Sequence, residues 1–226
     1  MNDIVDLFTR PDGLNLQNAS PPLQVALLMG LSTLLPAALM TATCFTRVII
    51  VLSFVRQGLA TQQVPPNLVL TGLALFLSLF IMQPVFGEID QKALQPYMNK
   101  QMTGQEAVRA GLDIHKRFLL RHTRTQDLAL FLHLAGNTTV QEAEQAPLLT
   151  VIPAFVISEL KTAFIMGFCI YLPFLMVDLV VSSVLTSMGM VMMPPVTISA
   201  PFKILLFVLA DGWHLVCYAI AASYSQ

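Results

Sequence analysis

The stretch TSMGMVMMPP, residues 186–195, places four methionines within six positions and ends at two prolines. Thioether sulfurs are soft ligands that can bind Cu(I), so a metal site is the first chemistry to consider. The stretch contains no cysteine or histidine, and the three cysteines of the chain show no CxxC spacing. We therefore expect no metal site, no cofactor and no disulfide framework, and we interpret the cysteines as small buried hydrophobic residues.

The same methionines also suit packing or sealing. Methionine is unbranched and fills irregular gaps, so core packing is one interpretation, and it suits Met188, which precedes Gly189. A loop between helices is usually polar, however, and this one is apolar. Hydrophobic constrictions can close a pore by excluding water. We expect this loop to line or border a closed constriction, with Val191 as its stiff β-branched member. The residues of this predicted gasket are Met190, Val191, Met192 and Met193.

Charged side chains isolated in apolar sequence form the second group of candidates. They are Glu159, Lys161, Asp178, Lys203 and Asp211. A charge that faces lipid costs at least a few kcal/mol, so each of them should face protein or water and have a partner. The partners could lie in the same chain or in a neighbouring subunit. We favour subunit contacts, because so many isolated charges are hard to satisfy within one small bundle. A small ion or proton transporter that uses Asp178 is an alternative of another class.

Nothing in the sequence predicts a catalytic site. We find no Ser/His/Asp grouping beyond chance, no HExxH motif and no glycine-rich phosphate loop. The formal net charge of −1 argues against binding to nucleic acid. We therefore expect a protein that is not an enzyme.

The composition indicates which elements must position these residues. The chain is 55% hydrophobic and only 11% charged, whereas soluble domains carry about 25% charged residues. Fourteen of the 25 charged side chains lie between Glu88 and Glu144, which leaves an apolar block on either side. We expect an all-α fold of the integral-membrane type, with about four hydrophobic helices broken by proline or glycine and a small helical polar insert. The expected parts are a polar N-terminal segment (1–20), a first hydrophobic hairpin (21–87), the polar insert (88–150) and a second hydrophobic hairpin with the methionine loop (151–226).

Each apolar block is long enough for two helices of about 20 residues. We expect them to run from Pro22 to about Val55, from Asn67 to Gly87, from near Pro153 to Ser187, and from Ala200 to Tyr224. Arg47 and Arg56 favour a cytoplasmic turn after the first helix, which would place the insert on the periplasmic side. The acidic N-terminus lacks the basic and apolar regions of a signal peptide.

The insert itself has helical signals. Thr103 followed by Glu106 predicts a capping box, and Gly136-Asn137 predicts a helix end. Phe118 and Phe131 are candidates for a contact between the inserts of neighbouring subunits, with a small core inside the insert as the alternative.

Four long stretches of the chain are similar to the FliP family, the integral inner-membrane component of type III secretion export gates. They are FTRVIIVLSFVRQGL (45–59), PPNLVLTGLALFLSLFIMQPVF (65–86), SELKTAFIMGFCIYLPFLMVDLVVSSVL (158–185) and GMVMMPPVTISAPFKILLFVLADGW (189–213). The stretch RFLLRHTRTQDLALF (117–131) resembles the flagellar members in particular.

The resemblance implies a pore-forming structural subunit of the flagellar basal body in the bacterial inner membrane. It implies a homo-oligomer, a pentamer, with FliQ-like and FliR-like subunits, contacts to FlhB-like and FlhA-like export proteins, and passage of unfolded exported proteins. The equivalent subunit of a virulence injectisome is an alternative. The family's loop has three consecutive methionines that seal the closed pore. Here Val191 replaces the middle one, and Met193 stands where other members often have valine.

Overall fold

The computed structural model describes residues 40–61, 64–136, 146–190 and 192–225, together with scattered positions between 22 and 36. These residues form helices and no strand, so the expected all-α fold is confirmed. The helices are α3 (Phe45–Gly58), α4 (Asn67–Ile89), the π-helical segment η1 (Asp90–Leu94), α5 (Gln95–Met98), α6 (Gly104–His122), α7 (Thr125–Leu134), α8 (Leu148–Ser187), α9 (Pro195–Leu209) and α10 (Gly212–Ala222).

Among the residues that the structure describes, two helices are long and apolar enough to cross a membrane. One is the run of α4, η1 and α5, which has 32 residues, and the other is α8, which has 40 residues. At a rise of about 1.5 Å per residue, both exceed the roughly 30 Å of a bilayer's hydrocarbon core. The pair α9 and α10 is bent by 63° and would make a third span if the two helices cross together.

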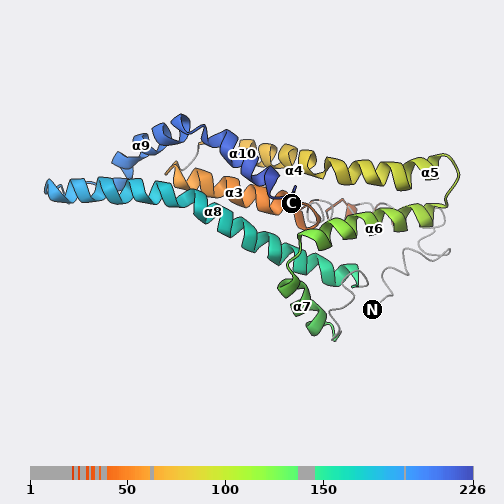
Figure 1. Ribbon diagram of the computed structural model, residues 1–226. Coiled ribbons are helices and arrows are strands. Elements are labelled where there is room, and N and C mark those ends of the chain that lie inside the picture. Colours follow the sequence, from red (N-terminus) through yellow and green to blue (C-terminus); the bar gives the residue numbers. More distant parts are fainter. Residues whose placement is uncertain are drawn as a thin grey trace.

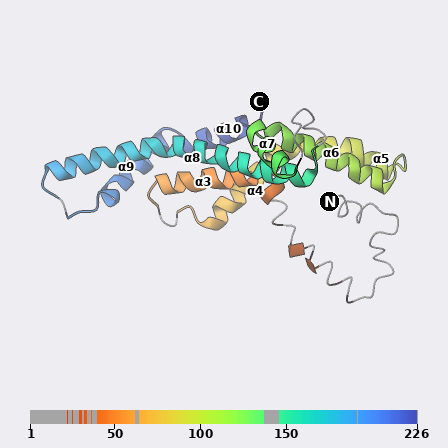
Figure 2. The same ribbon diagram turned by 90° about the horizontal axis from the view of Figure 1, so that it is seen from below.

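The molecule is elongated. Figures 1 and 2 show the turn between α8 and α9 at one end and the hairpin of α5 and α6 at the other. Helix α3 packs along α8 and also contacts α4, whereas α9 folds back on α8. The helix α8 carries Pro153 and Pro173 in its interior and is curved in Figure 1, as expected for prolines inside a helix.

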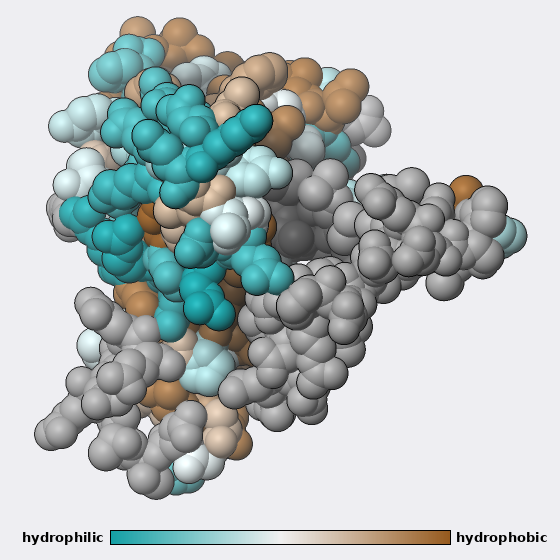
Figure 3. Space-filling view, turned by 90° about the vertical axis from the view of Figure 1, so that its right-hand side faces the viewer, coloured by the Kyte–Doolittle hydropathy of each residue, from teal (hydrophilic) through white to brown (hydrophobic). Residues whose placement is uncertain are grey.

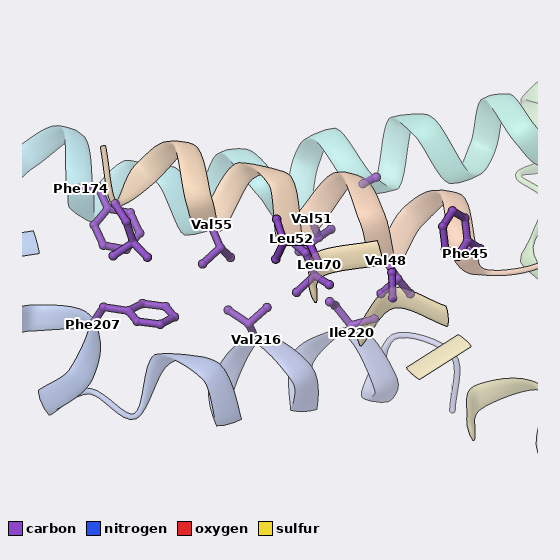
Figure 4. Close-up of a cluster of buried hydrophobic side chains, with 13 residues drawn as sticks. Phe45, Val48, Val51, Leu52, Val55, Leu70, Phe174, Phe207, Val216 and Ile220 are labelled. Carbon is purple, nitrogen blue, oxygen red and sulfur yellow. The ribbon is translucent and has the colours of Figure 1, made fainter. Parts of the chain in front are cut away.

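Helix α3 forms the centre of the first hydrophobic core. Its fully buried residues recur at helical spacing, and they are Val48, Val51, Leu52 and Val55. Figure 4 shows them facing Val216 and Ile220 of α10, while Phe174 of α8 and Phe207 of α9 close one end of the cluster. These side chains therefore pack α3 against the helices of the second hydrophobic block.

The polar insert has a core that it shares with α8. Leu119 of α6 and Leu132 of α7 are buried against Val151 and Phe155 near the start of α8. Figure 3 looks onto the end of the molecule formed by α5 and α6 and shows hydrophilic residues gathered there. The insert is therefore anchored to a membrane-type helix at its base and polar at its tip.

One glycine permits the close contact between α3 and α8. A β-carbon at Gly167 of α8 would lie 2.3 Å from a ring carbon of Phe54 of α3. That distance is far below van der Waals contact, so a larger residue cannot fit unless the ring moves.

The sequence signals in the insert are confirmed. Thr103 and Glu106 form the predicted capping box at the start of α6. Helix α7 ends at Leu134, and Gly136 follows with a positive φ of 79°. Both features depend on neighbouring residues only, which is why the sequence predicted them.

Three of the predicted helices differ from those in the structure. A bend and a turn at Thr43 and Cys44 precede α3, so no single helix runs through to Val55. The second helix does not end at Gly87 but continues through η1 to Met98, so no helix end marks the proposed start of the insert. The last helix begins at Pro195 and is broken at Asp211, whose φ of 49° is left-handed.

Candidate functional site

The methionine loop lies at the free end of α8, and its direction is set by a helix C-cap. Gly189 has a φ of 77°. This left-handed backbone conformation strains most residues, but glycine has no β-carbon and adopts it at little cost in energy. The N–H of Gly189 donates to the carbonyl of Thr186, and the N–H of Met190 donates to the carbonyl of Leu185, both at 3.0 Å. These two bonds define a Schellman motif. Two prolines then begin α9, with Pro195 at its first position, where its ring suits a helix start.

The methionine side chains of this loop are uncovered. Met192 is 97% exposed, Met190 is 38% exposed and Met193 is 45% exposed, and Val191 lies outside the described residues. Met188, which we expected to pack on its own helix, is 68% exposed. These methionines therefore form an apolar surface that the described part of the chain leaves exposed.

An ion pair ties α9 to α8 behind the loop. The ammonium of Lys203 is 2.7 Å from Oδ2 of Asp178, and the Ser199 hydroxyl donates to Oδ1 of the same carboxylate. Lys203 is buried, and Asp178 is partly buried. With both carboxylate oxygens bonded, the pair holds the two helices in register at the base of the loop.

Beside this ion pair, the two helices leave an apolar groove open. It has a volume of about 780 Å³ and is lined by side chains such as Val180 and Val184 of α8 and Phe202 and Leu206 of α9. An exposed apolar surface of this kind is typical of a contact with lipid or with another subunit.

A second buried network joins three distant segments. Both sides of the Arg47 guanidinium fork engage the Glu159 carboxylate, with Nε at 2.9 Å from Oε2 and Nη2 bonded to Oε1. The Tyr224 hydroxyl donates to the same carboxylate, and the Arg47 guanidinium carbon lies 3.9 Å from the centroid of the Tyr224 ring. Arg47 also donates to the Ser223 hydroxyl at 2.9 Å. The carboxylate is fully buried, and its charge is balanced inside the chain.

These networks change the interpretation of the five isolated charges. Glu159, Asp178 and Lys203 find their partners within the chain, so they do not require a neighbouring subunit. Lys161 and Asp211 are exposed and make no ion pair with the described residues. The argument for charges that pair between subunits therefore rests on these last two.

The two insert phenylalanines lie in or against the core. Phe118 is buried and packs near Phe155 and Tyr224, with ring centroids 6.2 and 6.4 Å away, and Phe131 is partly buried against the same cluster. The structure thus gives both residues a role inside the chain. A contact of either residue with a neighbouring subunit stays a prediction.

Sequence reasoning missed Arg47 and Tyr224. We placed Arg47 at the far end of the first helix and used it, with Arg56, to mark the following turn as cytoplasmic. It lies instead in the first turn of α3 and is buried, so only Arg56 stays close to that turn. The position of Arg47 between FT and VII was a usable signal, because an isolated arginine in apolar sequence needs a partner. Nothing local marked Tyr224.

A histidine borders this network. The ring of His122 lies 4.9 Å from the Tyr224 ring and 4.8 Å from the Phe118 ring, measured between centroids. Burial, followed by the nearby positive charges of Arg47 and Arg121, lowers the pKa of His122 to about 4. The imidazole is therefore neutral at neutral pH.

Metal and thiol chemistry find little support among the described residues. They contain no group of three or more His, Cys, Asp or Glu side chains that could hold a metal ion. All three cysteines are free, and Cys44 is buried as expected. Cys169 is exposed, however, so its interpretation as a buried residue was wrong.

Comparison with known proteins gives a consistent family match. The model of the FliP family matches residues 28–220. The flagellar biosynthetic protein FliP of Bacillus subtilis (strain 168) is 50% identical over 99% of this chain and 100% of its own length. The protein of that name from Cereibacter sphaeroides is 48% identical over 89% of this chain and 67% of its own length. The one from Pectobacterium carotovorum subsp. carotovorum is 46% identical over 96% of this chain and 84% of its own length.

Proposed function

The chain belongs to the FliP family, and from that premise we propose that it is a pore- and gate-forming structural subunit of the flagellar type III protein export apparatus. It assembles as a homo-oligomer, a pentamer by the family resemblance, with FliQ-like and FliR-like subunits. FlhB-like and FlhA-like export proteins contact this assembly. Unfolded axial proteins pass through it across the inner membrane, and the subunit carries out no reaction of its own.

The observation that carries this proposal is the uncovered methionine loop on a rigid stem. A Schellman motif and two prolines fix the loop's direction, and the ion pair between Lys203 and Asp178 fixes its base. The side chains themselves are flexible and apolar. When several copies meet around an axis, such loops can close a pore against water and still yield to a passing chain.

Two further features support assembly in a membrane. The groove between α8 and α9 is apolar and open, and large hydrophobic side chains such as Phe168 and Leu179 of α8 are more than half exposed. We place the polar insert on the periplasmic side and the turn after α3 in the cytoplasm, an orientation that Arg56 supports.

The rival functions fit less well. The relatives described above carry the flagellar name, which favours the flagellar apparatus over a virulence injectisome. A transporter needs a carboxylate that can lose and regain its proton during each cycle. Asp178 is instead engaged on both carboxylate oxygens, by the Lys203 ammonium and by the Ser199 hydroxyl.

The decisive experiment changes the loop and measures leakage. Replacement of Met190, Met192 and Met193 by alanine, in cells that also express the partner subunits, should leave the mass of the purified complex unchanged. Small solutes should then cross the inner membrane faster, because the shorter side chains leave a gap at the axis. The control is Met98→Ala, which changes another exposed methionine, at the end of α5 and at the opposite end of the molecule.

Two outcomes would contradict the proposal. An unchanged permeability barrier in the triple variant would exclude the loop as the seal. A monomeric protein, both alone and with its partners, would exclude the assembly.

A further inference from the structure

Two charged side chains of the second hydrophobic block have no partner in the part of the chain that the structure describes. Lys161 lies on α8 and Asp211 lies at the break between α9 and α10, and both are exposed. Neither side chain makes an ion pair or a hydrogen bond with a described residue. The other three charged residues of this block are paired inside the chain. A charge in apolar surroundings is costly, so these two, which have opposite signs, each require a partner from outside.

Lys161 interrupts an apolar stripe on α8. The stripe consists of exposed side chains spaced three or four residues apart, so they share one face of the helix. They are Ile157, Phe164, Phe168 and Leu172. Lys161 continues the same spacing between the first and the second of them. A contiguous apolar surface marks a contact with lipid or with protein, and a single lysine within it favours a protein partner that carries a carboxylate.

This α8 stripe faces away from the helix that packs most closely on α8. Glu159 turns toward Arg47 of α3, and Lys161 follows Glu159 by two residues. Two residues correspond to about 200° around a helix, so Lys161 points to the side of α8 that is opposite to α3. The α8 stripe is therefore an outer face of the molecule.

Asp211 lies on a different outer face. Its φ of 49° marks the break between α9 and α10, where the two helices are bent by 63°. Exposed apolar side chains flank the break, and Leu209 and Leu215 are each more than half exposed. Figure 1 shows α8 along one edge of the molecule and this break along the other. Two charges of opposite sign thus lie on two separate apolar faces of one chain.

We propose that Lys161 of one copy of the chain forms an ion pair with Asp211 of the next copy. The inference rests on the proposed homo-oligomer and adds the two faces through which neighbours meet, the α8 stripe of one copy and the α9–α10 break of the next. A head-to-tail contact of this kind uses two different surfaces and closes into a ring. Each copy supplies one lysine and one aspartate, so a closed ring leaves neither charge without a partner.

The apolar side chains and the ion pair have separate roles in this contact. The apolar side chains of both faces exclude water and lipid from it. The ion pair fixes how the two faces align, as a single polar position does in a coiled coil. A slip of one helical turn, about 5.4 Å, would separate the two charges and leave both in apolar surroundings.

The test reverses each charge in the full-length chain, which is expressed with its partner subunits and purified in mild detergent. Lys161→Asp places two aspartates at each contact, and Asp211→Lys places two lysines there. Each variant should lower the ratio of oligomer to monomer, measured by native mass spectrometry, by at least about tenfold, because like charges then face each other. The double variant Lys161→Asp/Asp211→Lys restores opposite charges and should recover most of that ratio.

A mixture of the two single variants distinguishes pairing between copies from pairing within one copy. The Lys161→Asp chain and the Asp211→Lys chain are co-expressed with different tags. Each contact between unlike copies then joins an aspartate to a lysine again. The two variants should therefore assemble together although neither assembles alone, whereas pairing within one chain predicts no such rescue.

The control is Lys100→Asp, which reverses an exposed charge between α5 and α6 and should leave the ratio unchanged. The pairing is overturned if either single reversal assembles as the wild-type chain does, or if Lys100→Asp lowers the ratio as much. It is also overturned if the co-expressed variants fail to recover the ratio, whatever the reason for that failure. In each of these cases an oligomeric wild-type chain leaves the export proposal standing, whereas a monomeric wild-type chain would refute both.

Discussion

Removal of Arg47 should destabilise the protein more than removal of any other single charge in α3. In Arg47→Met, the Glu159 carboxylate stays fully buried and loses both sides of the guanidinium fork. Its remaining hydrogen bond comes from the Tyr224 hydroxyl. The variant also loses the contact between the guanidinium and the Tyr224 ring, although methionine fills most of the volume.

The expected loss of stability in Arg47→Met follows from the burial of the ion pair between Arg47 and Glu159. Loss of one partner of a buried ion pair costs about 3–5 kcal/mol, because the other charge stays in a poorly solvating site. The double variant Arg47→Met/Glu159→Leu removes both charges and should recover most of that cost. Tyr224→Phe removes only a hydrogen bond to a charged group and should cost about 1.5–3 kcal/mol.

The assay is reversible unfolding in mixed micelles with increasing denaturing detergent, followed by helical circular dichroism. The control is Arg56→Met on the same helix. Arg56 is partly exposed and its side chain bonds to Asn67, so this change should cost less than about 1 kcal/mol. The reasoning fails if Arg47→Met costs no more than Arg56→Met. It also fails if the double variant is as unstable as the sum of its two single variants, because the pair would then contribute no coupling.

Two further changes test other parts of the structure. Gly167→Ala should destabilise the chain by about 1–3 kcal/mol in the same unfolding assay, because the added β-carbon would overlap the Phe54 ring. The control is Gly72→Ala in α4, where an added β-carbon would meet no atom within 4 Å. That change should be neutral or stabilise the chain by up to about 1 kcal/mol. Equal effects of the two changes would contradict the tight contact. The free energy of unfolding should also fall as pH drops from about 6.5 to about 4. The pKa of His122 is about 4 in the folded chain and returns to its ordinary, higher value on unfolding. The unfolded state therefore binds more protons in this pH range. His122→Gln should flatten that fall and a change of the exposed His133 should not; a profile that His122→Gln leaves unchanged would refute the assignment.

Local features of the insert were predictable because neighbours in sequence determine them. A capping box needs only Thr103 and Glu106, three residues apart. The left-handed Gly189 at the end of α8 is of the same kind, since the Schellman bonds reach back only a few residues. The break at Asp211 was missed, because a left-handed aspartate between two apolar runs has no strong local signal.

The partners of the buried charged residues, by contrast, could not be predicted from neighbouring residues. Arg47 and Glu159 are 112 positions apart, and the sequence gives no hint that they meet. Their burial follows from the packing of α3 on α8. The continuation of α4 through η1 to Met98 was also missed, because charged residues after Gly87 suggested a change of segment, whereas α6 packs against η1 and supports it.

The sequence by itself determined the helical class, the apolar blocks and the methionine loop at a helix break, because composition and short-range periodicity act on each segment separately. The tertiary structure alone decided which charges are satisfied inside the chain and which apolar surfaces are left uncovered. It buries Glu159, Asp178 and Lys203 or places them beside their partners, and it leaves the methionine loop exposed. The physical reason is that desolvation and pairing of a charge depend on every helix around it, including helices that are far away in the sequence.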